Sequence, residues 1–339
     1  MQRTVARLSL QDLASRLDVS VKTVSGALHD DSIRMADSTR LRIRALAAEL
    51  GYEPNIVARG MRQGVMPILG IVAEGLITQP FATEIVRSLD NSARGYGLSL
   101  FVTNVGASRR VERGVAEVRR LLPKAIGFAT MYHHVVAFAP AMRDAISVTI
   151  NCREESGSIP AIVPDERRAA ATIVEHLFGR GRRCIAFLNL PGLIAGRLRE
   201  DGFRDAHAAR AVAVTESWIL PATRGARYTE YARSRVAECI EHLFTRFPQP
   251  DAILCGNDRV ALEVYGALRR HGRSIPDDVA VASFDNQAEI ARRLDPPLTT
   301  MALPHRVMGR RAAEILAGAR PAEQKIEEIP FRLVERAST

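Results

Sequence analysis

Apolar residues near the start of the chain recur every three or four positions, which is the period of an amphipathic helix. The first such row predicts a helix over residues 10–17, and Ser9 together with Asp12 fits a capping box at its start. Ser20 is a second candidate N-cap, and the apolar row after it predicts a helix over about residues 21–28. The three-residue break between the two rows is typical of a helix-turn-helix.

A third helix is predicted over residues 38–50, because apolar side chains occupy one face of it and three arginines another. Gly51 follows this row, and a glycine there readily takes the left-handed conformation that ends a helix. Three short helices in this order predict a small N-terminal headpiece. The three arginines are Arg40, Arg42 and Arg44.

From residue 67 onward, short β-rich runs alternate with helical stretches. Such alternation is typical of parallel sheets with helices on both faces, and the number of units predicts two lobes. We therefore expect an α/β protein with a helical headpiece and a bilobed core of two doubly wound parallel sheets. The strand-like runs cover residues 68–73, 98–105, 125–129, 146–152, 184–190, 252–255 and 279–284, and the helical stretches cover 81–94, 167–178, 229–246 and 258–271.

The composition is that of an ordinary folded protein without a membrane anchor. Of 339 residues, 47% are hydrophobic and 25% are charged, which excludes a disordered chain and provides for two or three domains. No apolar run is long enough to span a membrane, and the N-terminus carries Arg3 and Arg7 without the apolar segment of a secretory signal. We expect a cytoplasmic protein with no membrane partner.

The net charge of +9 favours an anionic partner, since a positive surface potential attracts polyanions. Residues 1–64 contain ten Lys and Arg against seven Asp and Glu, so the excess is not concentrated in the headpiece. A solvated basic surface explains the charge equally well. The net charge is therefore compatible with nucleic-acid binding, but only sequence motifs can distinguish this function from a solvated basic surface.

The motifs of common enzymes are missing from the sequence: it has no G-x-S-x-G, no G-x-G-x-x-G, no P-loop and no metal-ligand cluster. His133 and His134 are adjacent, so their side chains point apart, and we expect an exposed pair. The four cysteines are far apart, without C-x-x-C spacing, and are expected as reduced core residues. No enzyme activity, metal or cofactor is predicted. The cysteines are Cys152, Cys184, Cys239 and Cys255.

The sequence of the headpiece resembles one known family. Residues 8–64 read "LSLQDLASRLDVSVKTVSGALHDDSIRMADSTRLRIRALAAELGYEPNIVARGMRQG" and are similar, almost position by position, to the opening of the lactose and galactose repressor (LacI/GalR) family. The part "ELGYEPNIVARGMR" matches that family's linker and hinge helix, which a generic helix-turn-helix lacks. The resemblance continues in "DERRAAATIVEHLFGRGRRCIAFLNL", "DAILCGNDRVALEVYGALRRHGRSIPDDVAVASFDN" and "DPPLTTMALP".

This resemblance implies a division into domains. A DNA-binding headpiece is expected over residues 1–53, a hinge helix and linker over 54–66, and an effector-binding and dimerisation core over 67–339. The core would have the bilobed fold of periplasmic binding proteins, with three crossings between its lobes. The resemblance places about 67–163 and 296–321 in the N-terminal lobe, and about 164–295 and 322–339 in the C-terminal lobe.

In this family the second helix enters the major groove, and its base-reading positions correspond to Val21, Lys22 and Gly26. Lys22 can donate to guanine O6 or N7, and Val21 can contact a thymine methyl group. A phosphate contact or a solvated side chain is the alternative for Lys22. Gly26 departs from the family, which often has arginine there. The candidates for phosphate contacts, whose hydroxyl or imidazole groups suit backbone oxygens, are Thr23, Ser25 and His29.

The segment from Asn55 to Met61 resembles the family's hinge. Isolated helices of fewer than about 12 residues are marginal in water, so we expect this segment to fold on operator DNA. In the family, paired hinge helices lie in the minor groove and insert a leucine at the central base step; Met61 corresponds to that leucine, with Ala58 one turn before it. A flexible linker without a DNA role is the alternative.

The resemblance also implies a ligand site in the cleft between the lobes, beyond the carboxyl ends of the strands. The family's effector arginine corresponds to Arg199 in "GRLREDGF", whose guanidinium can hold a carboxylate or vicinal hydroxyls with two parallel hydrogen bonds. Asn257 in "GND" and Asp285 in "SFDN" correspond to its polar effector contacts, or else cap the helices after their strands. Further matches to the pocket are Glu74, Phe81 and Asn151, and Tyr228 is a candidate for stacking on the ligand.

We therefore expect a transcriptional regulator of the repressor type, acting as a homodimer on near-palindromic, double-stranded operator DNA. A sugar, a sugar acid or a similar metabolite in the cleft would change its DNA affinity, either weakening it or, as a corepressor, strengthening it. The alternative class is a solute-binding protein of the same bilobed fold, which would need an export signal and would have no headpiece.

Overall fold

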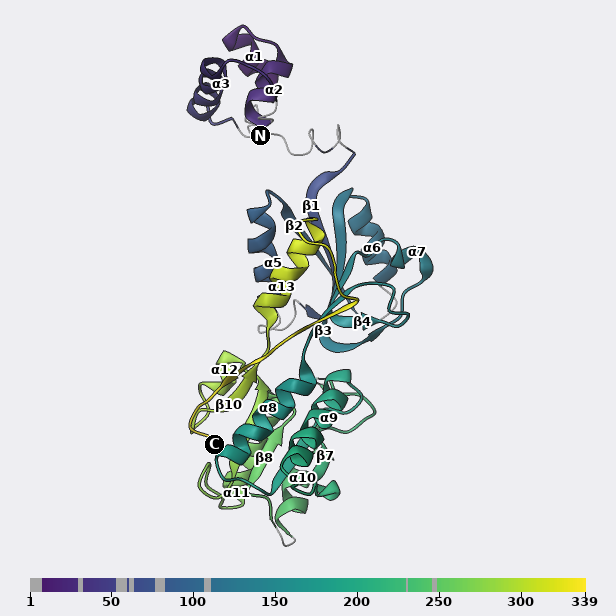
Figure 1. Cartoon of the computed structure of the whole chain (residues 1–339), viewed down its shortest axis with the longest axis vertical. Helices are drawn as coiled ribbons and strands as arrows, with labels where there is room; N and C mark the ends of the chain where they lie inside the picture. Colours follow the sequence, from purple (N-terminus) through teal and green to yellow (C-terminus); the bar gives the residue numbers. More distant parts are fainter. Residues whose placement is uncertain are drawn as a thin grey trace, which may run out of the picture. The chain divides into compact units, whose positions relative to one another are not determined.

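The computed structural model describes residues 8–29, 33–52, 60, 64–76, 83–106, 111–229, 231–245 and 249–339. The chain divides into two compact units, Met1–Gly64 and Val65–Thr339 (Figure 1). The headpiece expected from the sequence lies in the first unit, and the bilobed core forms the second.

The helices α1 (Leu10–Leu17), α2 (Val21–His29) and α3 (Asp37–Glu49) lie in the first unit. Their bounds agree with the predicted ones to within one residue. The capping box is present: Ser9 Oγ accepts a hydrogen bond from the backbone N–H of Asp12, whose carboxylate accepts one from the backbone N–H of Ser9. Gly51 has the left-handed φ of +63° that ends α3. The small core where the helices meet consists of Leu13, Ala14, Val24, Ala27, Ile43 and Ala47.

The arginines of α3 bind backbone carbonyls of the rest of the headpiece. Arg42 donates to the carbonyl of Leu17 at the end of α1, and Arg44 donates to that of Ala27 in α2. Carbonyls in the last turn of a helix lack intrahelical partners, so a guanidinium there stabilises both the hydrogen bonding and the helix dipole. Arg40 likewise donates to the carbonyl of Ile33. These arginines therefore join the three helices.

The first sheet of the core is entirely parallel, with strand order β11-β5-β4-β3-β1-β2. Helices cover both of its faces, as Figure 1 shows. The strands are β1 (Met66–Glu74), β2 (Ser99–Val105), β3 (Pro123–Val136), β4 (Val148–Glu154), β5 (Ala161–Pro164) and β11 (Ile326–Ile329). Helices α5 (Thr83–Gly95) and α13 (His305–Leu316) pack on one face, and α6 (Val111–Arg119) and α7 (Pro140–Arg143) on the other.

The second sheet has strand order β12-β10-β9-β8-β6-β7 and is parallel except for β12, which runs antiparallel to β10. Its strands are β6 (Ile185–Asn189), β7 (Ile219–Pro221), β8 (Ala252–Cys255), β9 (Ala280–Asp285), β10 (Thr299–Ala302) and β12 (Arg332–Val334). Helices α8 (Glu166–Gly179) and α9 (Ile194–Ala209) pack on one face, and α10 (Val236–Phe244) and α11 (Asp258–Arg270) on the other. A 3₁₀ helix (Glu216–Trp218) precedes β7, and α12 (Ala288–Ala291) follows β9.

The lobe boundaries predicted near residues 296 and 322 are wrong. Strand β10 pairs with β9 in the second sheet, and β11 pairs with β5 in the first. The chain therefore crosses between the sheets after β5, between β10 and α13, and between β11 and β12. Strands of three or four residues have too few positions for their pattern to show which sheet they join. The helix predicted over 229–246 begins only at Val236.

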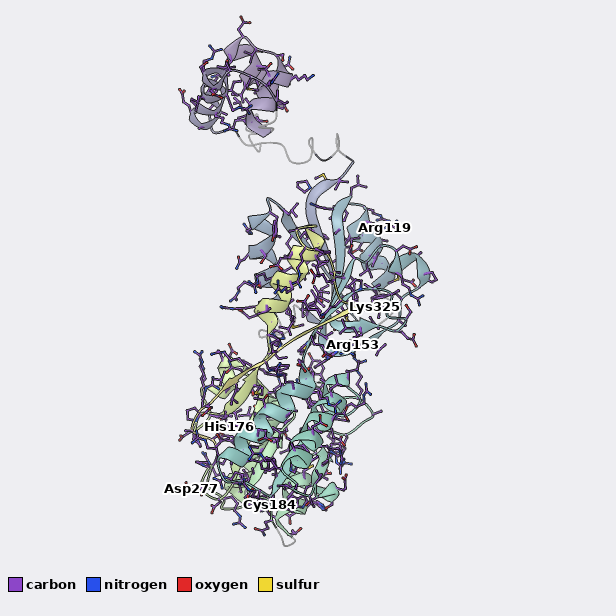
Figure 2. The ribbon with its side chains drawn as sticks, in the orientation of Figure 1. Arg119, Arg153, His176, Cys184, Asp277 and Lys325 are labelled. Atoms are coloured by element: carbon purple, nitrogen blue, oxygen red, sulfur yellow. The ribbon has the colours of Figure 1, made fainter. Side chains whose placement is uncertain are left out.

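The cysteines are free, and three of them are buried, as expected. Cys184 is half-buried instead; it precedes β6, at the end of the second lobe that carries the amino ends of the strands (Figure 2). Burial raises the pKa of Cys152 to about 12 and that of Cys255 well above its usual range. Neither thiol can act as a nucleophile at neutral pH. The single tryptophan, Trp218, belongs to the core of the second lobe.

Candidate functional site

A cavity lies at the carboxyl ends of the strands, and both lobes contribute to its wall. From the first lobe come residues at the end of β3 and in β4, and from the second come residues that follow or end β6, β8 and β9. Its volume is about 40 Å³, which is room for about three water molecules. The lining residues are Met131, Tyr132, His133, Asn151, Glu166, Leu190, Leu193, Ala195, Arg199, Tyr228, Asn257, Arg259, Asp285, Gln287 and Leu303.

Arg199 is held inside the protein by three contacts. Its Nε donates to Oε2 of Glu166 at 2.7 Å, and its Nη1 donates to the carbonyl of Gly256 at 2.5 Å. The guanidinium also lies over the ring of Phe284, 4.2 Å from the centroid. The two parallel hydrogen bonds expected toward a ligand would need at least one of these occupied nitrogens. Arg199 thus lines the cavity as predicted. The single N–H of Nε is used, so a fork of Nε and Nη2 is taken, whereas Nη1 carries a second N–H and a fork of Nη1 and Nη2 stays a prediction.

Glu166 is the first residue of α8, and its side chain is 1% exposed. Burial by itself raises its pKa, but the charge of Arg199 and the neighbouring His133 outweigh burial, so that the pKa of Glu166 lies below its usual range. The carboxylate therefore stays charged and neutralises Arg199. Glu166 was missed by the sequence analysis, although an acidic residue just after a strand, at the start of a helix, is a usable signal for this edge of the sheet.

The two adjacent histidines differ from the predicted exposed pair. His133 is 2% exposed and lines the cavity, and its Nδ1 lies 3.7 Å from Oε1 of Glu166. Burial lowers the pKa of His133, with Glu166 opposing the shift, so the imidazole is neutral at neutral pH. His134 points the other way and is half-buried, with Nε2 3.4 Å from Oε2 of Glu74. Side chains alternate along β3, so the two histidines point to opposite faces of the sheet. Neither is exposed, because both faces of this parallel sheet are covered.

Asn257 caps a helix, as one of its two predicted roles requires, and it also lines the cavity. Its Oδ1 accepts a hydrogen bond from the backbone N–H of Val260 and so caps α11, while its side chain faces the cavity. Its Nδ2 donates to the hydroxyl of Tyr228 at 2.9 Å. The ring of Tyr228 in turn meets that of Tyr132 edge to face, with centroids 5.9 Å apart. The predicted stacking residue therefore lies in the cavity wall.

Asp285 ends β9 in the cavity wall and does not cap a helix. Its Oδ2 accepts a hydrogen bond from Nε2 of Gln287 at 2.9 Å. Burial raises the pKa of Asp285, Arg199 opposes this shift, and the nearby Asp258 adds to it. Asp258 is itself completely buried, where the hydroxyls of Ser283 and Thr300 donate to it.

Asn151 lies on the opposite wall, in the first lobe. Its φ of +59° is in the left-handed region, which asparagine tolerates better than most residues. Its Nδ2 donates to the carbonyls of Thr130 and Met131, 3.0 and 2.8 Å away, at the end of β3. The amide nitrogen is therefore used to hold the cavity wall.

The cavity thus brings together five of the seven residues proposed as ligand contacts, which are Arg199, Asn257, Asp285, Asn151 and Tyr228. Glu74 does not line it and lies beside His134 instead. Phe81 lies outside the described residues. The polar residues of the wall that sequence reasoning missed are Tyr132, His133, Glu166, Arg259 and Gln287.

In the headpiece, the proposed DNA contacts on α2 differ in exposure. Lys22 is exposed, whereas Val21, Thr23 and Ser25 are half-buried. Ser20 caps the helix as predicted, with its Oγ accepting from the backbone N–H of Thr23 and lying 2.8 Å from the Thr23 hydroxyl. The Thr23 hydroxyl therefore forms a hydrogen bond with the capping side chain of Ser20.

Gly26 is buried, and a Cβ at this position would lie 2.8 Å from Cδ1 of Ile33. A side chain at this position would therefore displace that of Ile33, and a base contact by Gly26 stays a prediction. His29 is the last residue of α2. The hinge candidates Asn55, Ala58 and Met61 lie outside the described residues.

Within the described ranges, no group of three or more potential ligands is placed to hold a metal ion. In the same part of the chain, no helix is both long enough and apolar enough to cross a membrane.

Comparison with known proteins gives two family matches. Residues 9–55 match the family described as bacterial regulatory proteins, lacI family, and residues 174–339 match a periplasmic binding protein-like domain. The sucrose operon repressor of Escherichia coli is 32% identical over 337 residues, which cover 98% of this chain and 99% of that protein. The transcriptional repressor PurR of Vibrio cholerae is 26% identical, covering 97% of each chain.

Solved structures show the same fold. A LacI-family transcriptional regulator from Rhizobium etli is 29% identical with a TM-score of 0.71, covering 80% of this chain and 98% of that one. The lac repressor dimer bound to operator and an anti-inducer is 21% identical with a TM-score of 0.75, covering 98% and 99%. The full-length similarity, together with the helix-turn-helix and the two-lobed core, shows that the chain belongs to the lacI family of bacterial regulatory proteins.

Proposed function

We propose that this protein is a cytoplasmic transcriptional repressor whose affinity for a double-stranded operator changes when a small sugar-like molecule or sugar acid binds between the lobes. One observation carries the ligand site. Five candidate residues from segments far apart in the sequence, Asn151 to Asp285, line one cavity to which both lobes contribute. Concave sites with a few convergent polar groups and aromatic walls are typical ligand sites.

The chemistry of the cavity supports a ligand rich in hydroxyl groups. Amides, carboxylates and an imidazole line it beside the rings of Tyr132 and Tyr228, which suit the polar edges and apolar faces of a sugar. The similarity to a sucrose operon repressor points in the same direction. Isolated polar residues of this kind suffice for binding, and we propose no catalytic reaction.

The size of the cavity supports coupling between ligand and DNA. At about 40 Å³ it is too small for a sugar, so binding requires the side chains or the lobes to move. A ligand changes DNA affinity only through its differential affinity for the two arrangements. Either sign of coupling, release of DNA or corepression, is compatible with this mechanism.

The headpiece supports DNA binding by a homodimer. The lac repressor structure is a dimer on operator DNA, and two-fold symmetry would place two copies of α2 in successive major grooves. We propose that the hinge candidates Asn55, Ala58 and Met61 fold in the minor groove, with Met61 as the wedge. Met61→Ala would then reduce specific affinity and DNA bending more than non-specific binding, which bending assays on a selected operator measure.

The proposal is tested by comparing the full chain with a form that lacks residues 1–64, which are a compact unit of their own. An operator selected from random DNA should bind the full chain and not the truncated one, and a sugar should change that affinity. The truncated form should still bind the sugar. Specific DNA binding by the truncated form would refute the headpiece assignment, and a solute-binding protein would bind sugar without any selected operator.

A further inference from the structure

His133 is a buried side chain without a hydrogen-bond partner in the described part of the protein. His133 is 2% exposed, and neither Nδ1 nor Nε2 has a hydrogen-bond partner. Oε1 of Glu166 lies 3.7 Å from Nδ1, which is beyond hydrogen-bond distance. Buried polar groups are nearly always paired, so an unpaired imidazole in a cavity wall points to a partner from outside the chain.

The polar neighbours of His133 are already engaged. Glu166 accepts from Arg199, and Arg199 also donates to the carbonyl of Gly256. On the neighbouring strand β4, Asn151 donates to two carbonyls of β3, and in the second lobe Asn257 both caps α11 and donates to Tyr228. These side chains are therefore hydrogen-bonded within the protein, whereas neither ring nitrogen of His133 is.

The charged groups around His133 determine whether an anionic or an uncharged ligand group can bind beside it. A ligand carboxylate or phosphate beside the ring would also lie beside the buried, ionised carboxylate of Glu166. Two arginines line the cavity: Arg199 is already neutralised by that carboxylate, and Arg259, on α11, already has a contact within the protein. A hydroxyl group meets no such repulsion. It can also accept from the N–H of a neutral imidazole or donate to its other nitrogen.

We propose that His133 binds a hydroxyl group of an uncharged sugar, so that the site selects neutral sugars over sugar acids and sugar phosphates. The inference rests on the proposed function and narrows its ligand class. His133 lies on β3 of the first lobe, and the neighbouring Glu166 and Arg199 lie on α8 and α9 of the second. A hydroxyl seated between them would join the two lobes.

The test is calorimetric titration of the full-length protein with uncharged mono- and disaccharides, including sucrose, and with gluconate and glucose 6-phosphate. We expect binding by at least one uncharged sugar and at least tenfold weaker binding by both anions. His133→Leu should weaken binding of that sugar by about tenfold or more, as loss of a hydrogen bond to the ligand implies. His133→Gln keeps a donor and an acceptor and should stay within about threefold of the parent.

Thermal unfolding without ligand separates this role from a structural one. Because neither ring nitrogen of His133 has a hydrogen bond within the described protein, His133→Leu should lower the unfolding temperature much less than loss of a hydrogen-bonded buried histidine does. His207 is the matched control: it is equally buried, but its Nδ1 is paired with the carbonyl of Phe203 at 2.8 Å. His207→Leu should lower the unfolding temperature and leave sugar affinity unchanged.

Three results would overturn the inference: unchanged sugar affinity in His133→Leu, tighter binding of either anion than of every uncharged sugar, or no binding of any uncharged sugar. The proposed function fails separately. If either anion still alters operator binding, the protein remains a ligand-responsive repressor and only the role of His133 is lost. If no selected operator exists, the repressor assignment fails whatever the sugars do.

Discussion

Arg199 and Glu166 form a buried ion pair at the start of α8, with Nε and Oε2 2.7 Å apart and side chains only 4% and 1% exposed. The pair joins α8 to α9 at the cavity. A buried charge without a counter-charge destabilises a fold strongly. Removing either side chain of the pair therefore leaves the other as an unpaired buried charge. This is why the arginine that family resemblance assigns to the effector is also a structural residue of the second lobe.

Arg199→Met is expected to lower the free energy of unfolding by about 3–5 kcal/mol, because it leaves the carboxylate of Glu166 buried without its partner. Combining it with Glu166→Gln should restore a large part of this loss, since the double variant buries no unpaired charge. Urea titration followed by the fluorescence of Trp218, the only tryptophan, reports on this lobe directly. Additive losses in the double variant would show that the two side chains act independently.

Asp285→Asn is expected to change how stability depends on pH. Burial raises the pKa of Asp285 in the folded protein, so the folded state binds the proton more tightly than the unfolded chain does. The parent therefore loses stability as pH rises from about 4 toward neutrality. The variant should lose less, and at neutral pH its free energy of unfolding should exceed that of the parent by at least about 1 kcal/mol, the value of one pKa unit.

The matched control for this series is Asp205→Asn. Asp205 is exposed, and its hydrogen bonds with Arg167 lower its pKa, so its contribution to stability is lost as pH falls and not as it rises. The two variants should thus shift the pH profile in opposite directions, the effect at Asp205 being small. Parallel profiles for Asp285→Asn and the parent would show that this carboxyl has an ordinary pKa.

Lys22→Ala is expected to reduce affinity for a selected operator by about ten- to a hundredfold and to relax its sequence preference at one position, if the side chain reads a base. A phosphate contact would instead weaken binding to all sequences about equally. Lys124→Ala removes the same charge from an exposed position on β3 and serves as control. Fluorescence anisotropy on operator and scrambled DNA distinguishes these results, and an operator affinity equal to that of the control would exclude any DNA contact by Lys22.

Gly26→Val is expected to destabilise the headpiece by about 1–3 kcal/mol, because its side chain would overlap with Ile33. Ile33→Ala in the same chain should relieve part of this loss by making room. Ser25→Val changes the neighbouring, half-buried position and should have a smaller effect. Hydrogen exchange of the α2 amides in the full chain measures each case. Faster exchange in the double variant than in Gly26→Val alone would contradict this packing.

The sequence by itself determined the headpiece helices and the order of most core elements. Helix bounds could be read because their causes are local: Ser9 and Ser20 cap the turns that follow them, and Gly51 allows the left-handed residue after α3. Asn257 and Asp285 were assigned to the ligand site through the family resemblance. They meet at the cavity because the carboxyl ends of neighbouring parallel strands lie at one edge of a sheet.

Only the tertiary structure decided which groups meet. Glu166, at the start of α8, lies beside His133 on β3 and Arg199 on α9. His133 precedes Glu166 by 33 residues in the sequence, and Arg199 follows it by 33. The sheet that β10 and β11 each join, and the packing of Gly26 against Ile33, likewise depend on contacts between separate elements. A residue pattern encodes the face that an element buries, but not the partner that covers it, because many partners satisfy the same apolar face equally well.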